Sequence, residues 1–155
     1  MFKLGQDMFT TMHHNKIVTI EGIIKQAKPV TPELIIATFR CEACGKKIEL
    51  QQGGGKCKLL PPEKCISKSC NNDNQNFEFI QKTSKFIDYQ EVWLMPKKPP
   101  KIRLGRGQKV ILKKELVGGK EGENIRITGK LGFELKGRTN FAEPVVIASK
   151  IKRLD

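Results

Sequence analysis

Four of the five cysteines occur as two pairs whose spacing suits a metal ion. Cys41 and Cys44 form a C-x2-C pair followed directly by Gly45, and Cys65 and Cys70 form a C-x4-C pair after twenty intervening residues. Two thiolates at the first spacing can hold one side of a tetrahedral zinc ion, and the glycine lets backbone amides turn toward the sulfurs. Lysine, glycine, serine and asparagine surround both pairs, which argues against reduced cysteines packed as small apolar side chains. The pattern predicts one structural Zn²⁺ with all four thiolates as ligands, a closed site without a position for a catalytic water.

The fifth cysteine, Cys57, lies between the two pairs and has no second cysteine at a C-x2-C spacing. We interpret it as a spare thiol; the alternative is that it replaces Cys65 or Cys70 as a ligand. Five cysteines in a reducing compartment argue against a disulfide framework.

The charge of the chain favours a polyanionic partner. The sequence carries 29 Lys+Arg against 16 Asp+Glu, a formal charge of +13, and a cation that neutralises a phosphate releases counterions. A lysine-rich solubilising surface would give the same total, so the distribution of charge is more informative. Residues 96–114 contain eight cations and no acidic residue. Within them Arg106 lies between Gly105 and Gly107, where the backbone can approach a nucleic-acid strand closely.

Six cations are the candidate DNA contacts, four from this acid-free segment and two from a predicted hairpin tip at 136–140: Lys101, Arg103, Arg106, Lys109, Lys136 and Arg138. The alternative for the hairpin tip is an ordinary solvent-facing turn. Tyr89 and Trp93 share one face of a predicted strand, and we expect them to pack in the core rather than to stack on bases. Binding to nucleic acid would then be mainly electrostatic.

The elements that must position these residues are short strands. Apolar and β-branched runs predict strands at 16–27, 34–40, 76–80, 86–95, 108–114, 124–135 and 144–151. Gly22 interrupts the first run, which suggests a bulge or a sharp bend at a barrel corner. Residues 1–15 form a polar lead-in with one short helical turn, and convincing amphipathic helices are nearly absent. The pattern favours a sandwich or a small barrel, with the cysteine segment extending outside it.

Several function classes find no support in the sequence. The GGGKCK segment (53–58) lacks the spacing and the Ser/Thr of a phosphate-binding loop. No acid pair, nucleophile elbow or kinase signature is present, so we expect no catalytic activity from this chain. It contains no apolar run of transmembrane length and no secretory signal, and is therefore interpreted as intracellular, without a membrane partner.

Four segments in order resemble the N-terminal region of minichromosome maintenance (MCM) replicative helicases, especially archaeal ones. They are KIVTIEGIIKQAKPVTPELIIATFRCEACG (16–45), LLPPEKCISKSC (59–70), KTSKFIDYQEVWL (82–94) and KKELVGGKEGENIRITGKL (113–131). The resemblance implies a mainly β protein, a five-stranded OB-fold barrel with an inserted four-cysteine zinc-ribbon subdomain. The implied division is a lead-in at 1–15, a barrel at 16–40 and 81–155, and a zinc-binding subdomain at 41–80.

The resemblance also implies a function. In the family this unit forms a ring tier around DNA, so we expect a single-stranded-DNA-binding unit of DNA replication that forms rings, hexameric by resemblance, and is located in the cytoplasm at the nucleoid. Fifteen residues cannot hold the family's helical subdomain, and the ATPase module is missing, so we expect a divergent stand-alone form rather than a cropped piece. Two alternatives stay open: a non-catalytic protein that docks on full-length MCM subunits, and an RNA-binding zinc-ribbon/OB module.

Overall fold

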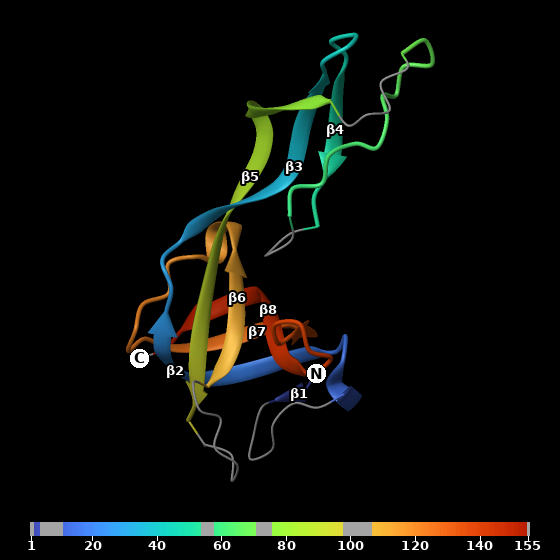
Figure 1. Ribbon diagram of the computed structural model, residues 1–155. Helices are drawn as coiled ribbons and strands as arrows, with labels where there is room; N and C mark the ends of the chain where they lie inside the picture. The colour runs from blue at the N-terminus through green and yellow to red at the C-terminus, as the bar shows by residue number, and fades with distance from the viewer. Residues whose placement is uncertain (1, 4–10, 54–57, 71–75, 98–106, 155) are drawn as a thin grey trace. The chain divides into compact units, whose positions relative to one another are not determined.

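The computed structural model describes residues 2–3, 11–53, 58–70, 76–97 and 107–154 (Figure 1). Nearly all regular structure within these residues is strand, with two short 3-10 turns. The elements in chain order are β1 (Phe2–Lys3), η1 (Thr11–His13), β2 (Ile17–Ala27), β3 (Thr31–Cys41), β4 (Lys47–Gln51), β5 (Phe77–Pro96), β6 (Gln108–Lys113), η2 (Lys114–Leu116), β7 (Asn124–Leu135) and β8 (Ala142–Arg153). In the described ranges, no helix has the length and apolar character needed to cross a membrane.

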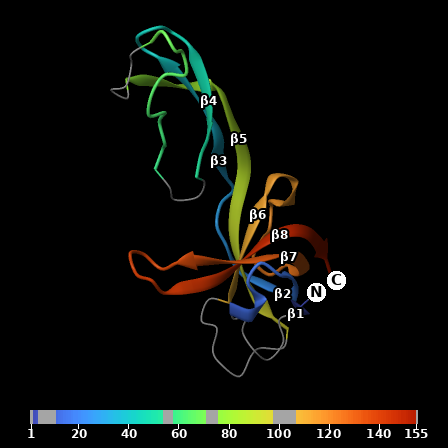
Figure 2. The ribbon, with the colours of Figure 1, turned by 90° about the vertical axis from the view of Figure 1, so that its right-hand side faces the viewer.

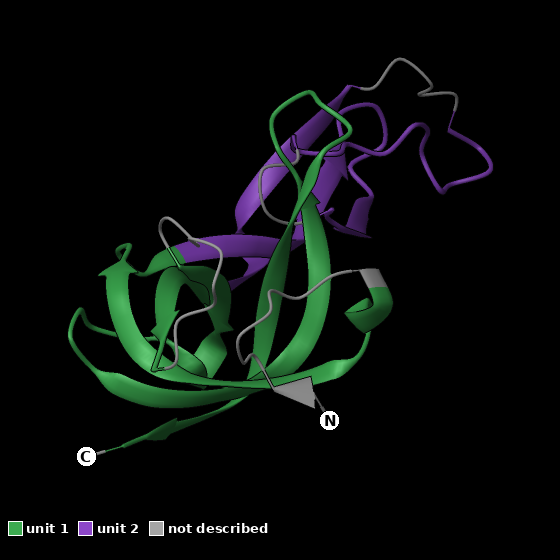
Figure 3. Cartoon of the chain, turned by 90° about the horizontal axis from the view of Figure 1, so that it is seen from below, with its two compact units in different colours: residues 1–31, 88–155 green, residues 32–87 purple. Residues whose placement is uncertain are grey.

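The chain forms two compact units, residues 1–31 with 88–155 and residues 32–87 (Figure 3). The second unit is longer than the predicted insert at 41–80, because it also contains most of β3 and the first half of β5. The boundaries of the second unit are therefore set by its paired strands rather than by the cysteine segment alone.

Five strands of the first unit close into a barrel. Around the barrel they follow the order β2-β7-β8-β6-β5, and β5 returns to pair with β2. All of these neighbours are antiparallel except β6 and β8, which are parallel. A closed five-stranded barrel with one parallel pair and Greek-key connections is the OB fold, which confirms the predicted fold class. The second unit is the connection between the first and second barrel strands, β2 and β5.

Gly22 lies where the barrel closes. In β2 it is paired with Ile125 of β7 on one side and with Pro96 of β5 on the other. A Cβ atom on Gly22 would lie 2.1 Å from the carbonyl oxygen of Met95, closer than any side chain tolerates. Only glycine lets the two backbones approach this closely, so Gly22 marks a close approach of β2 and β5, whereas the register shift of β2 against β5 lies between Ile24 and Gln26.

Alternating apolar residues of the five strands fill the barrel. The buried core consists of Val18, Ile20, Ile24, Val92, Leu94, Val110, Leu112, Ile125, Ile127, Leu131, Val146 and Ala148. Gln90 is the polar exception on the inward side of β5, and the structure satisfies its amide. Its Oε1 accepts hydrogen bonds from the N–H groups of Gly118 and Gly119, both at 2.9 Å. Its Nε2 donates to the carbonyls of Lys28 and Gly119 at 3.0 and 2.9 Å.

The second unit is a small sheet with a thin core. β3 pairs with β4 from Ile36↔Gln51 to Arg40↔Lys47. On its other edge, Thr38 donates its N–H to the Ser84 hydroxyl of β5 at 2.9 Å. Phe39 is fully buried, and its ring lies 5.9 Å from that of Phe79. Such a core leaves little net stability, which is a reason for a metal staple in this unit.

The structure differs from the predicted strands in two places. The predicted strands at 76–80 and 86–95 are one strand, β5, and β4 was not predicted at all. The structure places a 3-10 turn at the end of the lead-in, at Thr11–His13, while residues 4–10 lie outside the described ranges.

Candidate metal centre and nucleic-acid face

The first cysteine pair lies on a tight turn between β3 and β4. Gly45 donates its N–H to the carbonyl of Cys41 at 2.8 Å, and Cys41 donates its own to the carbonyl of Lys46 at 2.9 Å. Gly45 has a φ of 78°, a left-handed conformation that favours glycine. The turn therefore depends on the glycine that follows the C-x2-C pair, and it presents Cys41 and Cys44 on the same side.

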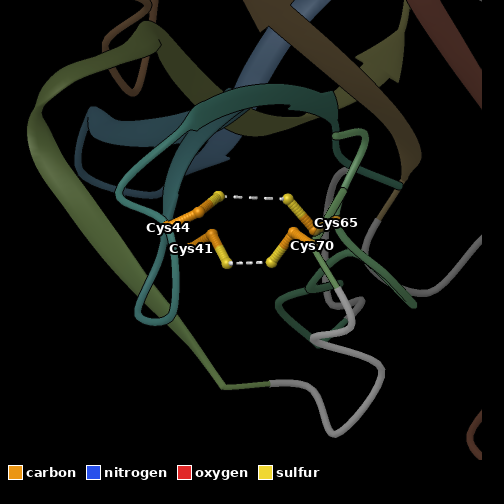
Figure 4. Close-up of side chains that lie close together, drawn as sticks. All are labelled: Cys41, Cys44, Cys65 and Cys70. Carbon is orange, nitrogen blue, oxygen red and sulfur yellow. Dashed lines mark hydrogen bonds between the residues drawn. The ribbon is translucent and has the colours of Figure 1, made fainter. Parts of the chain in front are cut away.

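The second pair approaches the turn from an irregular segment. The Sγ atoms of Cys41 and Cys70 are 3.6 Å apart, and those of Cys44 and Cys65 are 3.5 Å apart (Figure 4). All four sulfurs lie within 4.8 Å of one another. These separations are far too long for a disulfide bond of about 2.05 Å. A regular tetrahedron of Zn–S bonds of about 2.3 Å has S–S edges of about 3.8 Å, close to what is found. The four cysteines therefore fit a single tetrahedral metal ion.

The thiol of Cys65 is shielded from water. A hydrogen bond from the Ser67 backbone lowers its pKa, but burial together with the neighbouring thiols of Cys44 and Cys41 outweighs this and raises it above its ordinary value. A metal ion bound here must displace protons from such thiols. The predicted spare thiol, Cys57, lies outside the described residues.

The outward side of β5 and β6 carries a network of four alternating charges. Lys109 of β6 makes ion pairs with Glu91 of β5 at 3.1 Å and with Glu134 of β7 at 2.8 Å. Lys28, between β2 and β3, contacts the other carboxylate oxygen of Glu91 at 3.0 Å. The side chains of Lys109 and Glu91 are only 7% and 9% exposed, whereas Lys28 is 51% exposed. The Lys28 end of the network is therefore exposed to water, whereas its centre, formed by Glu91 and Lys109, is buried.

The pKa values of the two central groups follow from this arrangement. Burial raises the pKa of Glu91, but hydrogen bonds from Lys28, Lys109 and Tyr89 outweigh it and leave the pKa below its ordinary value. Burial lowers the pKa of Lys109, but its bonds to Glu134 and Glu91 leave the pKa above its ordinary value. Both groups are thus charged at neutral pH.

Two aromatic residues of β5, Trp93 and Tyr89, lie within this network. Trp93 is buried, and the ammonium groups of Lys28 and Lys109 lie 5.4 and 5.9 Å from the centre of its ring. Tyr89 is half-buried, and its hydroxyl donates to Glu91 at 3.1 Å. Trp93 is packed, as predicted, although it packs on the outward side of the barrel rather than inside it.

The hairpin between β7 and β8 is the second basic feature. Figure 2 shows it extending away from the other strands of the first unit. Its turn is closed by hydrogen bonds from Lys136 to the Phe141 carbonyl at 2.9 Å and from Thr139 to the Lys136 carbonyl at 3.1 Å. Lys136 and Arg138 are both exposed. The hairpin tip therefore has the predicted position and carries two exposed cations on a defined turn.

The structure separates the six candidate DNA contacts into three groups. Lys136 and Arg138 are available at the hairpin tip. Lys109 stays a prediction, but its ammonium is buried between two carboxylates, so a phosphate would have to displace one of them. Lys101, Arg103 and Arg106 lie outside the described residues.

Sequence reasoning missed the partners of Lys109. Glu91 and Glu134 stand 43 positions apart in the sequence and carry no motif, so only the closed barrel brings both to one lysine. The one available signal was the spacing of Glu91, which lies two residues from both Tyr89 and Trp93. This spacing places all three on the same predicted strand face.

Comparisons with known proteins agree with this architecture. A family model described as the MCM OB domain matches residues 7–133. The DNA replication licensing factor MCM6 of Arabidopsis thaliana is 32% identical over 126 residues, which are 77% of this chain and 14% of that protein. The licensing factor mcm4 of Schizosaccharomyces pombe is 28% identical over 118 residues, 74% of this chain and 13% of that protein. The chain thus spans a small part of the length of these relatives.

Among solved structures, the N-terminal domain of an archaeal MCM superimposes with a TM-score of 0.76 at 20% sequence identity. The superposition covers 95% of this chain and 59% of that chain, and it shows the same fold. The family match at residues 7–133 takes in the whole second unit and most of the barrel, so this protein belongs to the family of MCM OB domains.

Proposed function

We propose that this chain is a non-catalytic, zinc-containing OB unit that binds single-stranded DNA in DNA replication. The observation that carries the proposal is the connectivity of the barrel. The outward face of the second and third strands and the loops after the first and fourth strands form the oligonucleotide-binding surface of OB folds. Here the fourth and fifth strands are β7 and β8, and the loop that joins them is the exposed hairpin with Lys136 and Arg138.

The charge of the molecule supports a nucleic-acid partner. The chain has a formal charge of +13, and the hairpin tip at 136–140 contains two cations and no acidic residue. The buried network on β5 and β6 is internally neutralised, so the exposed cations dominate the interaction with phosphates. The predicted contacts Lys101, Arg103 and Arg106 come between β5 and β6 in the sequence, outside the described residues, and stay predictions.

The cysteine geometry supports a structural zinc ion in the second unit. Cys41, Cys44, Cys65 and Cys70 would bind it, and zinc would hold the irregular segment with the second pair against the β3–β4 turn. A four-thiolate site has no open position for water, so its contribution is to folding rather than to chemistry. Ring formation and association with MCM subunits are the further expectations from the family, as is a location where DNA is replicated.

The test is competition binding with the zinc-loaded chain. Fluorescence anisotropy would compare a labelled single-stranded DNA with its duplex and with RNA of matched sequence, and mass photometry would report the oligomer. We expect preference for single strands and an affinity that falls with salt with a slope of roughly −0.7 per phosphate neutralised.

Two double variants locate the binding surface. Replacing Lys136 and Arg138 by alanine should weaken binding by about 1–3 kcal/mol for two charge-assisted contacts. Replacing Lys150 and Lys152, two exposed lysines toward the far end of β8, removes the same charge as a control. Equal losses from both double variants would mean diffuse charge and would refute the hairpin as a binding element. A preference for RNA would favour an RNA-binding module instead.

A second candidate function is docking on another MCM subunit. Its supporting observation is that the second unit exposes three apolar side chains close in sequence to the second cysteine pair, Leu59, Leu60 and Ile66, at 45%, 48% and 60%. A stoichiometric complex with a full-length MCM subunit, lost on replacing Ile66 by serine and unaffected by DNA, would support this function over DNA binding.

A further inference from the structure

The most exposed large apolar side chain in the described part of the chain is an aromatic ring on the basic hairpin. Phe141 is 78% exposed and lies in the turn segment, one residue before β8. An isolated phenylalanine in water forgoes about 2 kcal/mol of burial, and exposed aromatic rings often mark binding sites. The hairpin from Leu135 to Ala142 contains two cations and no acidic residue.

The strand register places this ring beside a cation. Leu135 pairs with Ala142, so the next pair toward the turn is Lys136 with Phe141. The 2.9 Å hydrogen bond from the Lys136 N–H to the Phe141 carbonyl closes this pair. Directly opposed residues of an antiparallel ladder lie on the same face, with Cβ atoms about 4.5–5.5 Å apart. The ring of Phe141 and the side chain of Lys136 therefore leave the same face of the hairpin as neighbours.

The face that they share continues into the barrel surface already described. By the two-residue period of a strand, Lys136 lies on the same side of β7 as Glu134, the carboxylate bound by Lys109. That ion pair offsets the charge of Glu134, while Glu143, its partner across the ladder, places a second carboxylate on the same face. The charge network thus connects the ring and its lysine to the outward face of β5 and β6.

The turn holds this pair in place. The Thr139 hydroxyl donates to the Lys136 carbonyl at 2.7 Å and accepts from the Phe141 N–H at 3.3 Å. Gly137 takes a left-handed conformation, with a φ of 57°, which lets the turn close. The ring therefore projects from a backbone that is already ordered, so that stacking on it requires little further ordering of the chain.

We propose that Phe141 is a stacking platform for one unpaired nucleobase and that Lys136 binds the adjoining phosphate. A flat apolar ring beside a cation matches the repeating unit of a single strand, a base with a flat face joined to an anionic backbone. A duplex does not offer such a base, because its bases are stacked on one another. This proposal rests on the proposed function and adds a recognition element that distinguishes bases from backbone.

The test uses two oligomers of equal length and charge, a labelled oligo-dT and an abasic oligomer with the same sugar–phosphate backbone. Anisotropy would give both affinities for the wild type and for Phe141→Leu, Phe141→Tyr and Lys136→Ala. Phe86→Leu is the matched control, because Phe86 is 43% exposed on β5 in the second unit. Since Phe141 is exposed, its variants should keep the wild-type circular dichroism and Trp93 fluorescence.

We expect the wild type to prefer oligo-dT over the abasic oligomer. Phe141→Leu should lower the dT affinity on the order of tenfold and leave the abasic affinity unchanged, because stacking is lost and charge is kept. Phe141→Tyr and Phe86→Leu should behave as the wild type. Lys136→Ala should weaken both oligomers alike and reduce the salt slope by about 0.7.

Three outcomes would overturn the proposal. If Phe141→Leu leaves the ratio of dT to abasic affinity unchanged, the ring does not stack on bases, while DNA binding itself stands. If the wild type binds neither oligomer at low salt, the proposed function and this inference both fall. If Phe141→Leu dissociates a self-assembled form in mass photometry and leaves DNA affinity unaltered, the ring is a contact between copies of the chain.

Discussion

Replacing Gly22 by alanine tests whether barrel closure depends on a single missing side chain. The added Cβ would lie 2.1 Å from the Met95 carbonyl oxygen and 3.0 Å from the Cα of Pro96. To reach an allowed contact, β2 and β5 must separate by roughly 1 Å, which is enough to break an N–H···O bond. Their paired segment runs from Gly22↔Pro96 to Ala27↔Val92, so the perturbation falls at one end of the closing seam.

The expected cost can be worked out from that geometry. Loss of two or three ladder hydrogen bonds at about 1 kcal/mol each, with some strain in the packed core, gives roughly 2–4 kcal/mol. That is a large share of the stability of a small domain, about 5–15 kcal/mol. Urea unfolding followed by fluorescence of Trp93, the single tryptophan and two residues before Met95, would measure it.

The matched control is Gly132→Ala on β7. A Cβ at Gly132 would meet nothing nearer than the Val145 carbonyl oxygen at 4.0 Å. Alanine there should be neutral or stabilise by about 0.4–1 kcal/mol, because it restricts the unfolded chain. If Gly22→Ala unfolds at the same urea concentration as the wild type, β2 and β5 do not approach as closely as described, and the argument for closure fails. Equal losses at both glycines would point to a general effect of alanine instead.

Two further predictions concern the charge network and the metal centre. Glu91→Gln should destabilise the fold by about 1–3 kcal/mol at neutral pH. This value is modest because Lys109 still has Glu134 as its ion-pair partner. The difference from the wild type should disappear as the pH falls below 4.5 and Glu91 is itself protonated, since its folded pKa is lowered. Cys65→Ser should abolish stoichiometric zinc in metal analysis, while Cys57→Ser keeps one ion per chain; zinc retained by Cys65→Ser and lost by Cys57→Ser would refute the ligand set.

The cysteine site was predictable because its information is local. Cys41, Cys44 and Gly45 are contiguous enough for one turn to set their geometry, and the second pair is likewise short. The fit of a metal depends on thiol number and spacing within such turns, and the tertiary structure had only to bring the two pairs together. The barrel class was predictable for a related reason, since apolar alternation marks strands wherever they pair.

Two elements were missed because their side chains give too weak an apolar pattern to mark a strand. β4 is a short strand of alternating polar and apolar residues, and its ladder comes from β3. The first half of β5 contains the polar run at 81–85, which breaks the apolar pattern, yet Thr83 and Ser84 bond to Thr38 of β3 and keep the strand continuous. Both bonds use a hydroxyl group, so a polar segment remains a strand here because its side chains and backbone find partners on the neighbouring strand.

The sequence by itself determined the alternation that fills the barrel, the thiol set and the excess of positive charge. Only the tertiary structure decided which of those charges are free. Lys109 and Lys136 read alike in the sequence, as lysines in basic strand-and-turn segments. Barrel closure brings two carboxylates to Lys109 and leaves Lys136 in water on the hairpin. Whether a cation can meet a phosphate depends on its neighbours in space, and Coulomb interactions act over a few ångströms regardless of distance along the chain.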